Sequence, residues 1–192
     1  MLERDPHKLF PHDHLMRYTF VPLIPKFVTP NMVTMFRILC TPFVLWFLYT
    51  EQYAIGVPLF VLLSFSDALD GSLARIRKQV SNWGTFYDPL ADKILIGSVV
   101  LLVVVKHVNV VFGLIIVIVE ASIILGGYLR KLNGKITGAN IFGKTKMVLQ
   151  VVGVTLLLLA IWMGFDLFIP VSIGTLSLAI VFAVISLFTY GL

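Results

Sequence analysis

The chain has 192 residues, of which 58% are hydrophobic and 13% are charged, and its mean hydropathy is +0.96. A composition this apolar indicates an integral membrane protein and argues against a soluble domain with a large core. The formal net charge of +5 is best explained by membrane topology and contact with anionic lipids, since no nucleic-acid-binding motif accompanies it. Cys40 is the only cysteine, which excludes a disulfide within the chain.

Residues 1–30 differ in composition from the rest of the chain, because they hold five of its nine prolines. Proline interrupts helices, so this segment is too broken to span a bilayer. Arg17, Tyr18 and Lys26 suit the headgroup level of a membrane, and apolar residues lie between them. We therefore expect residues 1–30 to form an amphipathic segment that lies in the interface.

Six apolar runs follow, and each is long enough to cross the hydrocarbon layer, which takes roughly 18 residues or more. They cover about residues 32–50, 54–74, 84–105, 108–129, 145–164 and 167–190. The first run begins far from the N-terminus and lacks a small-residue cleavage site after it, so it should remain in the mature protein. We predict an all-α protein with one six-helix membrane domain over residues 31–192.

Basic residues set the expected orientation. They cluster before the first run, after the second run and around the connection between the fourth and fifth runs, as Arg4, Lys8, Arg17, Lys26, Arg75, Arg77, Lys78, Arg130, Lys131, Lys135, Lys144 and Lys146. The other connections hold almost none. The positive-inside rule then places both termini and the end rich in aspartate in the cytoplasm. We expect a multi-pass protein of a bacterial cytoplasmic membrane.

Acidic residues gather in one short stretch between apolar runs: Asp67, Asp70, Asp88 and Asp92. Spacings of three and four residues put each pair on one face of a helix. Carboxylates at membrane depth are costly and mark functional sites, and an oxygen-rich site of this charge suits Mg²⁺ or Mn²⁺. A zinc site is not expected, because the cysteine and the histidines (His7, His12, His14 and His107) lack zinc-ligand spacing.

The stretch from Ser66 to Lys93 contains the pattern D-x2-D-G-x2-A-R-x8-G-x3-D-x3-D. Its fixed positions are Asp67, Asp70, Gly71, Ala74, Arg75, Gly84, Asp88 and Asp92. This pattern resembles the signature of the CDP-alcohol phosphotransferase family. The resemblance implies six transmembrane helices, a homodimer and a reaction in which an alcohol attacks the diacylglycerol-bearing phosphorus of a CDP-lipid and CMP leaves.

The resemblance also implies roles for individual residues. Asp67 and Asp88 would each contact two divalent ions, Mg²⁺ or Mn²⁺, while Asp70 would contact the first and Asp92 the second. Asp92 would also be the general base.

The nucleotide-binding residues implied by the family are Asn31, Thr34, Gly71, Ala74, Arg75, Ser81 and Gly84. Small residues would let the nucleotide approach the helix backbone, and Arg75 would bind the pyrophosphate. Simpler alternatives are helix packing for Gly71 and Gly84, a helix cap for Asn31, and a membrane anchor for Arg75.

The segments Asp88 to Lys93 and Gly143 to Gln150 look most like the phosphatidylglycerophosphate synthase branch, whose acceptor is sn-glycerol 3-phosphate. Candidates for binding the acceptor phosphate are the cations Arg37, Arg130, Lys135, Lys144 and Lys146. An aspartate is an alternative partner for Arg37, and the other cations can also serve as membrane anchors.

One departure stands against that acceptor, because Val119 precedes Glu120 where the branch usually has arginine before glutamate. Transfer to phosphatidylglycerol, as in cardiolipin synthases, and transfer to inositol phosphate are alternatives. A divalent-cation transporter would explain the aspartates, but not the spacing of the glycines and Arg75.

Overall fold

A computed structural model describes residues 11–25, 27–132 and 141–190. This part of the chain is helical, without strands, which confirms the predicted all-α class. A short helix and a 3-10 turn, α1 (Pro11–Thr19) and η1 (Val21–Leu23), precede the long helices. These are α2 (Pro30–Tyr49), α3 (Tyr53–Ile76), α4 (Asn82–His107), α5 (Val110–Leu132), α6 (Ile141–Met163) and α7 (Phe168–Tyr190).

Each predicted apolar run corresponds to one long helix, but the helices differ in how much uninterrupted apolar length they have. Within the described residues, α2, α3, α6 and α7 are long and apolar enough to cross a membrane, and α5 contributes a shorter apolar stretch, Val110–Gly126. Helix α4 carries Asp88, Asp92 and Lys93 near its beginning, which shortens its apolar part. The count of six spans stays a prediction.

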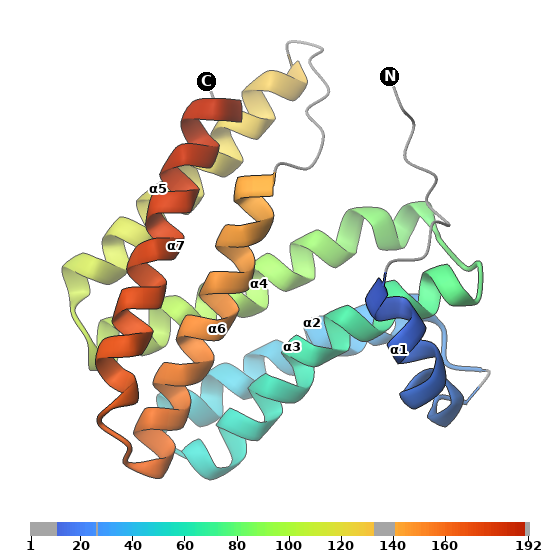
Figure 1. Ribbon diagram of the computed structural model, residues 1–192, viewed down its shortest axis with the longest axis horizontal. Coiled ribbons are helices and arrows are strands. Elements are labelled where there is room, and N and C mark those ends of the chain that lie inside the picture. Colours follow the sequence, from blue (N-terminus) through green and yellow to red (C-terminus); the bar gives the residue numbers. More distant parts are fainter. Residues whose placement is uncertain (1–10, 26, 133–140, 191–192) are drawn as a thin grey trace.

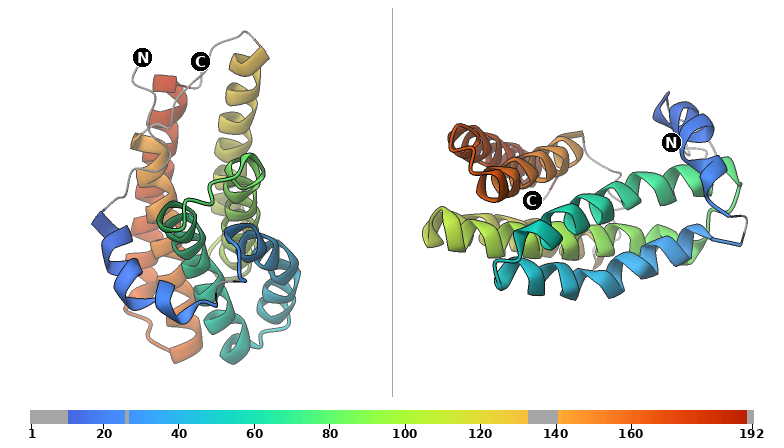
Figure 2. Two further views of the ribbon diagram at one scale, coloured as in Figure 1. Left: turned by 90° about the vertical axis from the view of Figure 1, so that its right-hand side faces the viewer. Right: turned by 90° about the horizontal axis from the view of Figure 1, so that it is seen from below.

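The helices pack in two groups (Figures 1 and 2). Helices α2, α3 and α4 lie side by side, and α6 pairs with α7 along its length. Helix α5 contacts α4 and α7, while α6 crosses both α3 and α4 and joins the two groups. A core of fully buried side chains, among them Val44, Phe60, Leu95, Val99 and Leu157, fills the interior.

Local sequence explains where the helices that carry the aspartates begin. Thr29 caps α2 by accepting a hydrogen bond from the backbone N–H of Met32, and Pro30 occupies the first helical position, where a missing N–H costs nothing. Ser81 caps α4 through a 2.9 Å hydrogen bond from the backbone N–H of Gly84. The Ser81 cap lies directly beside the signature residue Gly84.

At the opposite end of the bundle, polar contacts join the turn between α2 and α3 to the end of α4. Lys106 lies 2.9 Å from Glu51, and its hydrogen bond lowers the pKa of that exposed carboxyl. The hydroxyl of Tyr53 lies 2.8 Å from Nε2 of His107. This end holds no signature residue.

The N-terminal segment packs against α3 at the end that carries the signature (Figure 1). The Arg77 guanidinium donates to the backbone carbonyls of Val28, at 2.7 Å, and Ile24, at 2.8 Å. The rings of Phe20 and Phe65 meet edge to face with centroids 4.9 Å apart. Arg77, one of the basic residues that set the expected orientation, is thus also a structural link between the N-terminal segment and α3.

Candidate active site

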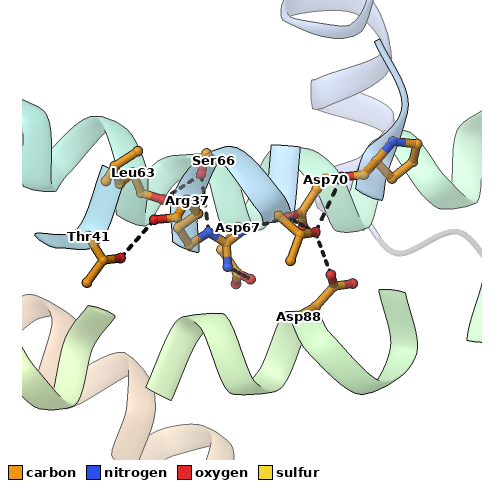
Figure 3. Close-up of polar contacts among 9 residues, drawn as sticks. Arg37, Thr41, Leu63, Ser66, Asp67, Asp70 and Asp88 are labelled. Atoms are coloured by element: carbon orange, nitrogen blue, oxygen red, sulfur yellow. Dashed lines mark hydrogen bonds and ion pairs between the residues drawn. The ribbon is translucent and has the colours of Figure 1, made fainter. Parts of the chain in front are cut away.

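Arg37 of α2 lies at the centre of the polar network (Figure 3). Its side chain is fully buried, with Nη1 2.8 Å from Asp67 and Nη2 2.5 Å from Asp70, and its Nε donates to Ser66 at 3.3 Å. The sequence left two kinds of partner open for Arg37, an aspartate or a phosphate. In the structure its partners are aspartates. The guanidinium is fully buried and paired with both aspartates, and its place among the acceptor candidates stays a prediction from sequence.

Thr34 lies one turn before Arg37 and connects the two helices that carry the aspartates. Its hydroxyl lies 3.2 Å from a carboxylate oxygen of Asp70 on α3 and 2.6 Å from one of Asp88 on α4. It also lies 3.3 Å from the carbonyl of Pro30. Thr34 therefore sits within the carboxylate cluster, where it orients Asp88 toward α3.

A cavity of about 690 Å³ opens between α3, α4 and α6, and its lining includes Asp67, Asp70, Asp88 and Asp92. The structure thus brings the predicted metal ligands to one cavity. Asp92 is nearly fully buried, whereas the Asp67 side chain is 42% exposed. The wall formed by α6 is mainly apolar, with Val148, Val151 and Val152. The cavity therefore has a charged end and an apolar side.

The donor chemistry fits a hard divalent cation, because carboxylate oxygens are the ligands that Mg²⁺ and Mn²⁺ prefer. Yet in the described part of the chain no three His, Cys, Asp or Glu side chains stand together closely enough to hold one ion. In this arrangement the Arg37 guanidinium is paired with both Asp67 and Asp70. Bringing these carboxylates onto a shared ion requires a change in their side-chain positions.

A smaller cavity of about 160 Å³ adjoins the first one, and its lining includes nearly all the residues predicted to contact the nucleotide: Asn31, Gly71, Ala74, Arg75, Ser81 and Gly84. Asn31 accepts a 2.8 Å hydrogen bond from Ser81. The helix-cap alternative for Asn31 is wrong, because Thr29 caps α2. Arg75, Gly71 and Asp88 line both cavities, so the two share a wall.

Of the two signature glycines in this smaller cavity, Gly84 has the closer neighbours. A Cβ atom there would lie 3.0 Å from Oδ1 of Asn31 and 3.2 Å from Oγ of Ser81. At Gly71 the nearest atom to an added Cβ would be Nη1 of Arg75, at 3.4 Å. The absence of a side chain at Gly84 therefore preserves space beside polar groups, which helix packing alone does not require.

The acceptor candidates fall at different places. Lys146 is buried and donates to Glu120, which also accepts a 2.8 Å hydrogen bond from Gln150. These residues line a cavity of about 100 Å³ that shares Ile96 and Met147 with the aspartate cavity. Lys144 is exposed and lines the aspartate cavity itself. The Arg130 side chain and Lys135 lie outside the described residues.

Comparison with known proteins settles the family. The model of the CDP-alcohol phosphatidyltransferase family matches residues 27–189 of the chain. The chain belongs to this family. The match contains α2 to α6 and almost all of α7, together with every residue of the aspartate network, whereas α1 and η1 lie before it.

Similar proteins have names that state two different activities. A CDP-diacylglycerol--glycerol-3-phosphate 3-phosphatidyltransferase of Bacillus subtilis is 37% identical over 106 residues, 54% of either chain. A second protein of that name, from Arabidopsis thaliana, is 28% identical over 187 residues, 88% of this chain and 80% of its own. A probable cardiolipin synthase (CMP-forming) of Drosophila melanogaster is 37% identical over 73 residues, 38% of this chain and 23% of its own.

Sequence reasoning missed one buried polar residue beside the family's signature. Asp13 of α1 has no exposed surface, and its carboxylate contacts Ser72 and Arg75. No spacing rule could have found it, because it lies in the irregular N-terminal segment and reaches α3 only through the fold.

Proposed function

We propose that the protein is a phosphatidyltransferase of phospholipid biosynthesis. It transfers the phosphatidyl group of CDP-diacylglycerol to the hydroxyl of sn-glycerol 3-phosphate and releases CMP. The observation that carries this proposal is the junction of two cavities: a small polar one lined by the signature glycines and Arg75, and a larger one that joins the aspartates to an apolar wall. This arrangement suits a donor with a nucleotide at one end and acyl chains at the other.

In the proposed donor complex, the cytidine end occupies the smaller cavity against Asn31, Ser81 and Gly84. Arg75 forms charge-assisted hydrogen bonds to the pyrophosphate at the wall shared by the two cavities. The diacylglycerol end follows the apolar residues of α6, including Val148 and Val152. The reacting phosphorus then lies beside the aspartates.

The metal ligands we propose are Asp67, Asp70, Asp88 and Asp92, which would hold two divalent ions, Mg²⁺ or Mn²⁺. Bound divalent cations supply charge stabilisation at the phosphoryl group and at the departing phosphate oxygen. Thr34 orients Asp88 by its 2.6 Å hydrogen bond, and Arg37 neutralises part of the negative charge of the cluster. These contacts hold the carboxylates at one end of the cavity.

In the chemical step, an acceptor oxygen forms a bond to the diacylglycerol-bearing phosphorus, and the bond from that phosphorus to the oxygen of CMP breaks. Asp92 accepts the proton of the attacking hydroxyl as general base. Its placement supports this role, since it is buried and lines the aspartate cavity together with residues of α6. The products are the new phosphodiester and CMP.

The acceptor phosphate is bound, in this proposal, by Lys146, with Lys144 at the cavity that holds the aspartates. Glu120 fixes Lys146, and Gln150 adds a second polar contact to the same carboxylate. Arg130 and Lys135 remain candidates from sequence. Val119 stands where the branch usually has an arginine. In this proposal, Lys146 therefore contributes more to phosphate binding than it would if that arginine were present.

A second acceptor, phosphatidylglycerol, is supported by the similarity to the probable cardiolipin synthase of Drosophila melanogaster. The apolar side of the aspartate cavity offers surface for the acyl chains of a lipid acceptor. Lys146 beside that cavity favours an acceptor with a phosphate near its hydroxyl, which both acceptors have.

We further propose that all six long helices span the membrane as one domain, that residues 1–30 lie in the interface, and that the aspartate end faces the cytoplasm of a bacterial cell. Lys144 and Arg77 at this end support the orientation through the positive-inside rule. The homodimer implied by the family is part of the same proposal.

Lipid mass spectrometry tests the proposal. Purified protein is mixed with CDP-diacylglycerol and Mg²⁺ or Mn²⁺. Glycerol 3-phosphate, phosphatidylglycerol or inositol phosphate is then added as the acceptor in separate reactions. Phosphatidylglycerophosphate with equimolar CMP is the expected result. Cardiolipin or an inositol lipid would replace the acceptor but keep the reaction, and no CMP with any acceptor would overturn the proposed enzyme.

A further inference from the structure

Asp13, which lies outside the region matched by the family, forms an ion pair with Arg75 of the signature. Asp13 lies in α1, before the match begins at residue 27, and its side chain is fully buried. Its two carboxylate oxygens accept hydrogen bonds from two nitrogens of the Arg75 guanidinium. Nε donates to Oδ2 at 2.7 Å, and Nη2 donates to Oδ1 at 2.8 Å. Ser72 donates to the same carboxylate at 2.6 Å. This fork-like pairing fixes both the position and the plane of the guanidinium.

The guanidinium that Asp13 holds lies over Gly71, since a Cβ at Gly71 would be 3.4 Å from Nη1 of Arg75. That place is the wall common to the nucleotide cavity and the aspartate cavity. An arginine side chain has many rotamers, and restricting them before a ligand arrives reduces the entropy lost on binding. The Asp13 contact therefore acts where the orientation of Arg75 matters most.

Described residues that follow α1 also contact α3. Arg77, two residues after Arg75, binds the carbonyls of Ile24 and Val28, and Phe20 packs on Phe65. These contacts tie the connection between α1 and α2 to α3. They help to hold α1, and with it Asp13, against α3.

We propose that Asp13 is a positioning residue that holds Arg75 in the orientation that binds the pyrophosphate of CDP-diacylglycerol. The inference rests on the proposed function and deepens it, because it makes α1 part of the donor site. Asp13 acts through Arg75 and does not touch the lipid itself. Its loss weakens donor binding and leaves acceptor binding intact.

The test compares Asp13→Asn, Asp13→Glu and the matched control Asp166→Asn, which makes the same chemical change at an exposed residue between α6 and α7. Steady-state CMP release is measured as a function of CDP-diacylglycerol. We expect Asp13→Asn to raise KM for CDP-diacylglycerol about tenfold, the size of a typical coupling between contacting residues. Asp13→Glu should recover part of that loss, and KM for glycerol 3-phosphate should stay the same in every variant.

A double-mutant cycle separates positioning from a general structural role. In an Arg75→Gln background, Asp13→Asn should add nothing to KM, because the group through which Asp13 acts is gone. An equal increase in both backgrounds would overturn the inference. A KM for CDP-diacylglycerol that is unchanged or lower in Asp13→Asn would also overturn it, the lower value showing that the carboxylate competes with the pyrophosphate.

Ser72→Ala provides a second variant if Asp13→Asn does not fold, since it removes only the hydroxyl that orients Asp13. It should raise the same KM by a smaller factor, and a wild-type KM would count against the inference. If wild-type protein releases CMP while these variants behave as wild type, the inference fails and the proposed function stands. Wild-type protein that neither releases CMP nor is stabilised against heat by CDP-diacylglycerol overturns both.

Discussion

Arg37 and Asp70 form a buried ion pair across the α2–α3 interface, with 2.5 Å between Nη2 and Oδ2. The guanidinium has no exposed surface, and the carboxyl group almost none. A buried pair of this kind is costly to break from one side, because the remaining charge is left without a partner. The site therefore depends on a cation that comes from the protein itself.

Arg37→Gln should lower the thermal stability of the purified protein. Losing one partner of a buried ion pair costs about 3–5 kcal/mol, and the loss should shrink when Mg²⁺ is added, since a divalent ion can neutralise the same carboxylates. Thermal unfolding in detergent, with and without Mg²⁺, measures both effects. Arg17→Gln, at an exposed arginine, is the control. Equal unfolding temperatures for Arg37→Gln and wild type would show that the ion pair contributes no net stability.

Asp67→Asn should reduce CMP release by at least about a hundredfold, because stabilisation by a metal at a phosphoryl centre is worth several kcal/mol. Chelation of divalent ions should have the same effect on wild-type protein, and adding Mg²⁺ or Mn²⁺ should reverse it. The measurement is CMP release before and after chelation. Asp166→Asn should retain wild-type activity. Full activity in chelator, or in Asp67→Asn, would rule out the metal ligands proposed here.

Lys146→Gln should raise KM for glycerol 3-phosphate by about tenfold or more, since a hydrogen bond to a charged group contributes about 1.5–3 kcal/mol. KM for CDP-diacylglycerol should not change. Initial rates with each substrate varied in turn give the two constants. Lys106→Gln makes the same change at the opposite end of the bundle. If both KM values rise together in Lys146→Gln, the residue supports the whole site and does not select the acceptor.

Gly84→Ala should impair donor binding, because the new methyl group would lie 3.0 Å from Asn31 and 3.2 Å from Ser81. Those contacts are too close unless the polar side chains that line the nucleotide cavity move. The expected result is a higher KM for CDP-diacylglycerol with little loss of fold. Gly174→Ala is the matched control, as a methyl group there meets nothing within 4 Å. Wild-type kinetics in Gly84→Ala would make this glycine a packing residue only.

Hydropathy predicted the long helices, since apolar runs in a membrane protein must satisfy their backbone groups internally. It placed the end of the second run too early: residues 54–74 were expected, whereas α3 is Tyr53–Ile76 and includes Arg75. Polar signature residues lower local hydropathy without breaking a helix, so the helix continues past the apolar run. The connection between α5 and α6, residues 133–140, lies outside the described residues.

The faces of the aspartate helices followed from spacing, because Asp67 and Asp70 on α3 and Asp88 and Asp92 on α4 are separated by about one turn. Their partners did not follow from it. Whether Arg37 meets an aspartate or a phosphate is decided by how α2 packs on α3, and such contacts between distant segments leave no periodic signal.

The polar contacts around the aspartates come from α2, α3 and α4, whereas the hydrogen bonds of Glu120 join α5 to α6. In the proposed function, the nucleotide contacts and the acceptor contacts therefore come from different stretches of the chain. If these roles hold, substitutions in the later helices can change the acceptor alcohol while the nucleotide contacts stay the same. Chimeras that join the first three long helices of this protein to the later helices of a relative should follow the relative's acceptor preference.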